Sequence, residues 1–418
     1  MSKATAETPA EVAADLQDER LIREEGLGGA LRGFGRRVRG GDLGSLPVVI
    51  GLVVIWVVFQ VLNPNFLSAN NLVNLTLQCA AIGTISIGIV LVLLLGQIDL
   101  SVGSVSGVSA AILGVGFTQL HWPLWATVIV AILAGAVIGY VYGLLFTRFG
   151  VPSFVITLAG LLGFLGVQLW ILGANSSINI PYDSWIVQFA QQTFLPPWAA
   201  YALAVIAAGG MFVSDWRSNV RRRNAGLSEG STAAVALKAG LLLIGLCIAV
   251  WYLSTDRGTG AMFLFFVVLV IVMNFFLTRT KWGRSVFAVG GSVEAARRAG
   301  IKVNRVFISV FILCSTFAAV GGLLAAARLA SVGAGSGGTD TNLNAIAAAV
   351  IGGTSLFGGR GSAWSALLGI LVIQSISNGL TLMNLDSSYR FMITGAVLLL
   401  AVIIDSLSRR SRASHGQA

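Results

Sequence analysis

Long apolar runs recur from about residue 46 to the C-terminal region, and they constrain the fold more than any other feature of this sequence. A run of about 20 apolar residues is the length that crosses the hydrocarbon core of a bilayer as a helix. Only 11% of the 418 residues are charged, whereas a soluble domain carries about 25%. The sequence therefore predicts an all-α, polytopic integral membrane helix bundle and excludes an ordinary soluble protein.

The apolar runs predict about 10 to 12 transmembrane helices. The expected spans are 46–62, 72–95, 100–119, 123–147, 152–173, 197–214, 237–254, 261–278, 306–327, 343–358, 362–383 and 390–406. We expect a transmembrane permease domain over 45–408, with a soluble tail over 1–44 and a second tail over 409–418. No small-residue cleavage site follows the first run, so it is predicted to be a retained span and not a signal peptide.

The basic residues indicate the orientation of the chain. If the spans alternate, all of the 27 lysines and arginines except Arg257, Arg328 and Arg390 lie on the side of the N-terminal tail. Basic residues are enriched in cytoplasmic loops, so both termini and the loop 279–305 are predicted to be cytoplasmic. This topology explains the net charge of +10, and a nucleic-acid partner is not expected.

Residues for catalysis are scarce in this sequence. The two histidines, His121 and His415, lie in a predicted outer turn and in the terminal tail, so they form neither a nucleophile system nor a metal cluster. No Gly-Lys dipeptide occurs, which excludes a Walker A phosphate loop. We therefore predict a transport subunit without an ATPase site, cofactor or metal, and any ATP hydrolysis falls to a partner subunit.

Asp99 is the most unusual residue within the predicted spans. A carboxylate at the centre of a bilayer costs about 2.5 to 3.5 kcal/mol on insertion scales, and glycines and serines flank it here. The stretch around Gln97, Asp99, Ser101 and Gly103 is a candidate helix elbow or part of a translocation path. Asp99 has three interpretations: it caps the next helix near Ser101 and Val102, lines the path, or lies exposed in a turn.

A second glycine- and serine-rich string, residues 352–362, joins two apolar runs in the same way as residues 96–104. The pair indicates a weak internal repeat, a common feature of transporters. Gly135, Gly139 and Gly143 lie on one face of the span 123–147, where small residues favour close helix packing. Five intramembrane amides either bind ligand hydroxyls or bond neighbouring helices: Gln78, Gln168, Asn274, Gln374 and Asn378.

The loop 279–305 contains Ser292, then Glu-Ala-Ala, then a glycine at position 300, which describes a short capped helix on the membrane surface. Here the sequence resembles the Glu-Ala-Ala-x-x-x-Gly loop of ATP-binding-cassette importer permeases. The resemblance implies that this loop docks a cytoplasmic ATPase subunit. The docking residues implied are Gly290, Gly291, Glu294, Ala295, Ala296 and Gly300.

Three strings, 96–103, 288–301 and 349–362, are similar to the ribose and xylose branch of sugar importer permeases. An extra basic segment from Arg217 to Lys238 resembles the longer xylose-type members, whereas Gln97 replaces the glycine expected before Ile-Asp-Leu-Ser. The resemblance implies a homodimer in the bacterial inner membrane that receives a monosaccharide, such as the pentose xylose, from a periplasmic sugar-binding protein.

Two other classes of protein remain as alternatives. An ion-coupled secondary transporter or channel would use Asp99 as its coupling carboxylate. Against it stand the Glu294 loop and the scarcity of other intramembrane carboxylates. A membrane enzyme is disfavoured because no nucleophile or metal constellation is present in the sequence.

Overall fold

A computed structural model describes residues 46–174, 177–225, 227, 231–386, 388, 389, 391–396, 399 and 403. The predicted tails 1–44 and 409–418, and most of the predicted span 390–406, lie outside the described residues. The chain divides into two compact units, one containing residues 196–254 and the other residues 44–195 and 255–418. Each unit is considered by itself below.

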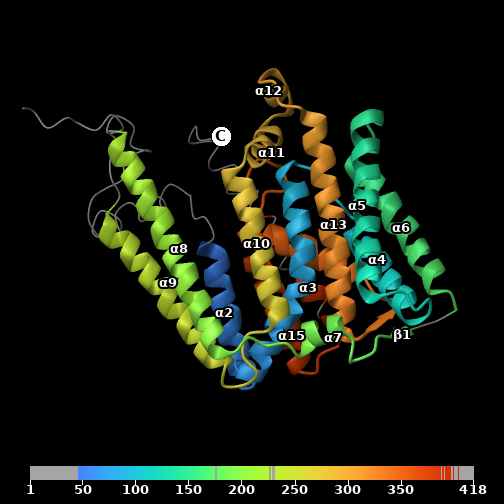
Figure 1. The fold of residues 1–418 in the computed structure, drawn as a ribbon, viewed down its shortest axis with the longest axis horizontal. Helices are drawn as coiled ribbons and strands as arrows, with labels where there is room; N and C mark the ends of the chain where they lie inside the picture. The colour runs from blue at the N-terminus through green and yellow to red at the C-terminus, as the bar shows by residue number, and fades with distance from the viewer. Residues whose placement is uncertain are drawn as a thin grey trace, which may run out of the picture. The chain divides into compact units, whose positions relative to one another are not determined.

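The smaller unit is a helical hairpin of α8 (Pro197–Asn224) and α9 (Thr232–Leu253) (Figure 1). The hydroxyl of Ser231 caps α9 by accepting a hydrogen bond from the amide of Ala234. Lys238 pairs with Asp215 on α8 at 3.2 Å. This hairpin contains the basic segment that the sequence identified as an insertion.

The larger unit is a bundle whose long helices run roughly side by side in Figure 1. Its two short strands, β1 (Ser177–Asn179) and β2 (Ser331–Gly333), pair antiparallel at the end of the bundle opposite α12. Its helices are α2 (Leu46–Leu62), α3 (Ala69–Leu94), α4 (Val102–Thr118), α5 (Leu124–Phe149), α6 (Ser153–Leu172), α7 (Trp185–Gln191), α10 (Ala261–Arg279), α11 (Lys281–Gly291), α12 (Val293–Arg298), α13 (Val303–Leu329), α14 (Thr339–Ile351) and α15 (Trp364–Leu382).

Burial, and not hydropathy, separates the core helices from the outer helices of the bundle. In helix α3, 89% of the most apolar window is buried, as expected for a helix at the centre of a bundle. In α5 and α6 only 33% and 28% of that window is buried, so their outer faces are open to the bilayer. Eight helices in the described part of the chain are long and apolar enough to cross a membrane, and α2 and α4 are apolar but shorter. The predicted polytopic bundle is confirmed.

Glycines allow α5 to pack directly on α13. A Cβ at Gly139 would lie 2.3 Å from the carbonyl oxygen of Phe311, and a Cβ at Gly143 would lie 2.7 Å from the Cα of Ile308. The helix backbones therefore touch, which only glycine permits at these positions. The predicted packing role of this glycine face is confirmed.

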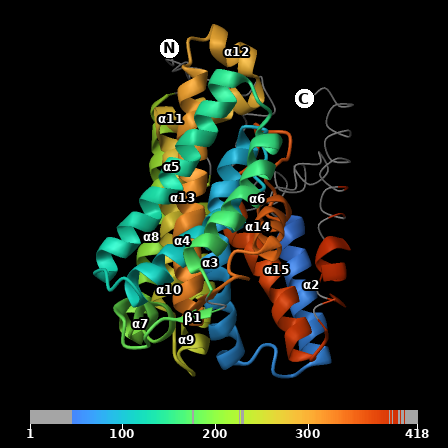
Figure 2. The same ribbon diagram turned by 90° about the vertical axis from the view of Figure 1, so that its right-hand side faces the viewer.

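One predicted span is wrong. The expected span 343–358 is replaced by α14, which has 13 residues and ends at Ile351. Gly352 ends the helix and Gly353 has a φ of +99°, so the backbone turns away before a full span is complete. Figure 2 shows α14 beside α15, and α15 beside α2. Residues 352–363 then connect α14 to α15 as a second elbow.

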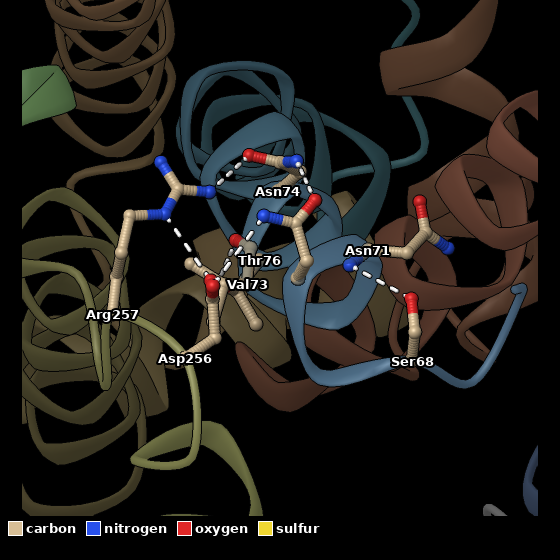
Figure 3. A network of polar contacts seen from close by, with 8 residues as sticks. Ser68, Asn71, Val73, Asn74, Thr76, Asp256 and Arg257 are labelled. Carbon is tan, nitrogen blue, oxygen red and sulfur yellow. Dashed lines mark hydrogen bonds and ion pairs between the residues drawn. The ribbon is translucent and has the colours of Figure 1, made fainter.

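A polar cluster fastens the start of α3 to the connection before α10 (Figure 3). Arg257 donates to the side-chain oxygen of Asn74 at 2.6 Å and pairs with Asp256 at 3.2 Å. The guanidinium also lies 5.3 Å from the ring centroid of Phe194, which is a favourable cation–π geometry. Asn70 donates to Asp256 at 3.5 Å. Arg257, one of the few basic residues predicted to be outside, therefore has a structural role at this end of the bundle.

Candidate functional site

The predicted elbow lies between α3 and α4, over residues 95–101. Gly96 has a φ of +69°, which turns the chain away from α3. Asp99 is 1% exposed, and its Oδ1 accepts hydrogen bonds from the amide of Ser101 at 2.8 Å and from its hydroxyl at 2.7 Å. The Cys314 thiol, 3.7 Å away, donates to Oδ2. Asp99 thus closes a local turn just before α4, and its carboxylate is enclosed by the bundle.

The other elbow residues lie next to Asp99 but have different neighbours. The side-chain amide of Gln97 is half-buried and contacts the carbonyl of Leu95 at 3.5 Å. Gly103, in the first turn of α4, donates its amide hydrogen to Oδ1 of Asn342 on α14. A Cβ on Gly103 would also lie 2.7 Å from the carbonyl oxygen of Gly337. The start of α4 therefore packs against the loop that leads into α14.

The loop predicted to dock an ATPase forms two short helices, α11 and α12, at one end of the bundle (Figure 1). Ser292 caps α12, since its hydroxyl accepts from the amide of Ala295 at 3.3 Å. Gly300 has a φ of +81°, so it reverses the chain as the pattern predicted. Glu294 and Ala295 are exposed, whereas Ala296 is 3% exposed and anchors α12 to the bundle.

Gly290 and Gly291, the first residues implied by the resemblance, have different environments. A Cβ on Gly291 would meet nothing within 4 Å, but a Cβ on Gly290 would lie 1.8 Å from the carbonyl oxygen of Leu94. The same Leu94 oxygen accepts a hydrogen bond from the amide of Gly359 at 2.9 Å. A Cβ on Gly358 would lie 2.7 Å from the carbonyl oxygen of Gly290.

Both elbows and α11 therefore meet through backbone atoms. We call this contact the glycine junction and define it by Leu94, Gly96, Gly290, Gly358 and Gly359. It brings together all three strings that carry the family resemblance. The two similar strings predicted as a weak repeat lie against each other here, since a Cβ on Gly96 would lie 3.3 Å from the carbonyl oxygen of Phe357.

A cavity of about 430 Å³ lies in the half of the bundle away from α12, between α3, α4, α13, α14 and α15. This volume is within the range of about 300 to 1,000 Å³ that is usual for small-molecule sites. Among the described residues, Arg328 is the only charged one that lines it. The main polar side chains on its walls are Gln78, Ser106, Thr341, Asn344, Gln374 and Asn378.

The elbow residues predicted as a translocation path are not among the residues that line this cavity. Of the five intramembrane amides, three reach it: Gln78, Gln374 and Asn378. Gln168 instead donates to the carbonyl oxygens of Gly333 at 3.1 Å and Ser336 at 2.8 Å, and so holds a loop.

Sequence reasoning missed Thr341, Asn344 and Arg328. A signal was available for α14, because its first turns read Thr-Asp-Thr-Asn-Leu-Asn before an alanine run. Polar residues at the start of an apparent membrane helix are expected to face protein or a cavity.

Comparison with known proteins identifies the family. The sequence pattern of the family described as "Branched-chain amino acid transport system / permease component" matches residues 71–402. The xylose transport system permease protein of Escherichia coli (strain K12) is 35% identical over 345 residues, which is 82% of this chain and 87% of that protein. The xylose transport system permease protein of Haemophilus influenzae is 33% identical over 367 residues, covering 87% of this chain and 96% of the relative.

A third relative is a ribose import permease protein of Escherichia coli (strain K12), 30% identical over 363 residues, or 86% of this chain and 92% of that protein. No solved structure matches the chain. The matches agree with the three glycine-containing strings and with the helix bundle, and they confirm the predicted transport subunit and the resemblance to the ribose and xylose branch. The chain therefore belongs to this family of membrane-embedded permease components.

Proposed function

We propose that the chain is the membrane subunit of an ATP-driven importer of a monosaccharide in the bacterial inner membrane, with xylose as the first candidate sugar. The relatives named for xylose and ribose transport support the substrate class. The cavity supports it as well, because the described residues of its walls carry amides, hydroxyls and the guanidinium of Arg328, and no carboxylate. Neutral sugars are recognised through hydrogen bonds, which such side chains provide.

The single observation that best supports ATP-driven transport is the form of α12. The helix is exposed on the face that carries Glu294 and Ala295, capped by Ser292 and ended by Gly300. Arg297 lies 3.3 Å from Glu294, and both side chains are more than half exposed, so this ion pair adds little to folding. The exposed side chains of this small helix contribute little to the stability of the fold. They are therefore available to dock into a cleft on an ATPase subunit.

Asp99 gives no support to the ion-coupled alternative. Its carboxylate is bonded to Ser101 and Cys314, and it does not line the cavity. The purified chain alone, in vesicles with a sodium or proton gradient, is expected to show no sugar uptake. Uptake should require an ATPase subunit and a sugar-binding protein from the same source, with ATP on the ATPase side. Gradient-driven uptake by the chain alone would refute this function.

The docking surface is tested with a large side chain on α12. Ala295→Trp should abolish co-purification of the ATPase subunit, because Ala295 is exposed and its replacement leaves the Ser292 cap in place. Ala174→Trp is the matched control, since Ala174 is an exposed alanine just after α6, at the other end of the bundle. Retention of ATPase binding in Ala295→Trp would reject the docking role.

Orientation and assembly are further parts of the proposal. The basic residues support cytoplasmic termini and a cytoplasmic α12. A cysteine at Ser292, an exposed position, should then be labelled only after the inner membrane is permeabilised. Labelling of this cysteine in intact cells would contradict the proposed orientation. A complex containing two copies of the chain is expected in native mass spectrometry, and a single copy per ATPase pair would reject the homodimer.

A further inference from the structure

We propose that the cavity between α3, α14 and α15 is a transit site for a neutral sugar, held mainly by the carboxamides of Gln78, Asn344 and Gln374. This inference rests on the proposed function and assigns the sugar to particular side chains. Each of the three helices contributes one of the carboxamides, and all three line the cavity.

The first argument is that the side chains of these three residues have no hydrogen-bond partner among the described protein atoms. Gln374 is 7% exposed, and within the described part of the chain no hydrogen bond to its side chain is made by protein atoms, nor to the side chains of Gln78 and Asn344. A carboxamide offers two donors and an acceptor, and leaving such groups unpaired inside a protein is costly. Gln78 and Asn344 are half-buried, so the donors and acceptors of these amides are available to water or to a ligand in the cavity.

The second argument is the contrast with amides that have a structural role. Asn378 accepts from the side chain of Asn71 at 2.8 Å, and Asn71 also donates to the carbonyl of Phe66 at 2.7 Å. Gln168 binds the carbonyls of the loop after β2. Asn378 also lines the cavity, but its side chain is hydrogen-bonded to Asn71, and the amide nitrogen of Gln168 is hydrogen-bonded although its Oε1 has no partner. Among the described amides that line the cavity, Gln78, Asn344 and Gln374 are therefore those whose side chains make no hydrogen bond to the protein.

The third argument is the composition of the walls. The described residues that line the cavity include no carboxylate, so they offer no anionic ligand to a metal ion or a proton-coupled cation, and their one charge is the guanidinium of Arg328, a hydrogen-bond donor. Ala81, Ile82 and Ile85 supply an aliphatic wall beside the amides. Hydrogen-bond donors and acceptors beside aliphatic surface suit a polyol with apolar C–H faces. A path also requires binding weak enough for release, which a few neutral hydrogen bonds provide.

The fourth argument connects the cavity to the glycine junction. Helix α3 ends at Leu94, and the elbow between α14 and α15 contains Gly359, which bonds to the Leu94 carbonyl. Gly290 of α11 touches both. A displacement of α11 by a docked partner therefore acts on the far ends of the same helices that carry Gln78, Asn344 and Gln374. The width of the cavity is thereby linked to the proposed ATPase surface.

Leucine substitutions test the site. Gln374→Leu and Gln78→Leu keep a similar volume and remove the donors and acceptor, so the maximal rate of ATP-driven xylose uptake should fall about tenfold, as expected when one hydrogen bond to the sugar is lost. Gln192→Leu is the matched control, because Gln192 is exposed and outside the cavity, and it should stay within about twofold of the parent. Correct folding is checked by size-exclusion chromatography.

A second measurement decides the case even if the leucine variants fail to fold. In Asn344→Cys, millimolar xylose should slow alkylation of the new thiol several-fold, whereas Gln192→Cys should show no protection. Protection by the anion xylonate and not by xylose would overturn the assignment of a neutral ligand to this site. Normal uptake in both leucine variants, or no protection by either compound, would overturn the site. Failure of the parent protein to transport any sugar with its partners would instead refute the proposed function.

Discussion

The glycine junction can be tested with a single methyl group. In Gly290→Ala, the added Cβ would lie 1.8 Å from the carbonyl oxygen of Leu94 and 2.9 Å from the amide nitrogen of Gly359, although real Cβ contacts essentially never fall below 3.0 Å. Either α11 or the end of α3 must therefore move by about 1.2 Å, the difference between 1.8 and 3.0 Å. Both obstructing atoms belong to the backbone, so no side chain can rotate to relieve the contact.

The magnitude follows from two costs. Overpacking of a tight interior site costs about 1 to 3 kcal/mol. Separation of Gly359 from Leu94 weakens a 2.9 Å hydrogen bond, which adds about 0.5 to 1.5 kcal/mol. Alanine also stabilises a helix by about 0.5 to 1 kcal/mol relative to glycine, which offsets part of these costs. The net destabilisation is about 0.5 to 4 kcal/mol, which at about 2 °C per kcal/mol for a large chain lowers Tm by about 1 to 8 °C.

The control is the neighbouring residue. Gly291→Ala makes the same chemical change one position later, where nothing lies within 4 Å, so its Tm should equal that of the parent or exceed it. Both variants are heated in the same detergent at one scan rate, because such unfolding is irreversible and its midpoint depends on rate. Equal midpoints for the two variants would show that the close approach of α11 to Leu94 is absent from the protein.

Three further predictions concern other parts of the larger unit. Gly139→Val should abolish accumulation of folded protein in the membrane because its side chain meets the Phe311 backbone, whereas Gly163→Val, with open space around it, should not; equal yields would contradict the packing of α5 on α13. Asp99→Asn should retain folded yield because its Oδ1 still accepts from Ser101, whereas Asp99→Ala leaves those buried donors unpaired at a cost of about 1 to 3 kcal/mol; a normal yield of Asp99→Ala in quantitative immunoblots would reject the turn. Burial raises the pKa of Asp256, but hydrogen bonds from Arg257 and Asn70 outweigh it and hold the pKa below its ordinary value, so the carboxylate stabilises the fold above about pH 4 and this contribution is lost as the pH falls through the folded pKa. Asp256→Asn should therefore lower Tm by more at pH 7 than at pH 3, and an equal effect at both values would contradict the charge-assisted cluster.

Much of the architecture could be read from the sequence because it depends on local composition. An apolar run of span length must become a helix in lipid, whatever its neighbours are. The Ser292 cap and the turn at Gly300 were predictable for the same reason, since each is set by residues within one or two helical turns. The prediction of a span over 343–358 was wrong for a local reason as well. It was based on apolar residues alone and did not take into account the helix end at Gly352 and Gly353 or the polar residues at the start of α14.

The tertiary structure alone decided which amides are free. Gln168 and Gln374 both lie in apolar helices, and the sequence around each one offers no distinction between a structural and a ligand-binding role. Gln168 meets backbone carbonyls of a loop about 165 residues later, whereas Gln374 faces a cavity. The glycine junction is a similar case, because Gly96, Gly290 and Gly358 are distant in sequence and meet only through packing. Partners of this kind depend on long-range contacts, which local hydropathy and spacing do not encode.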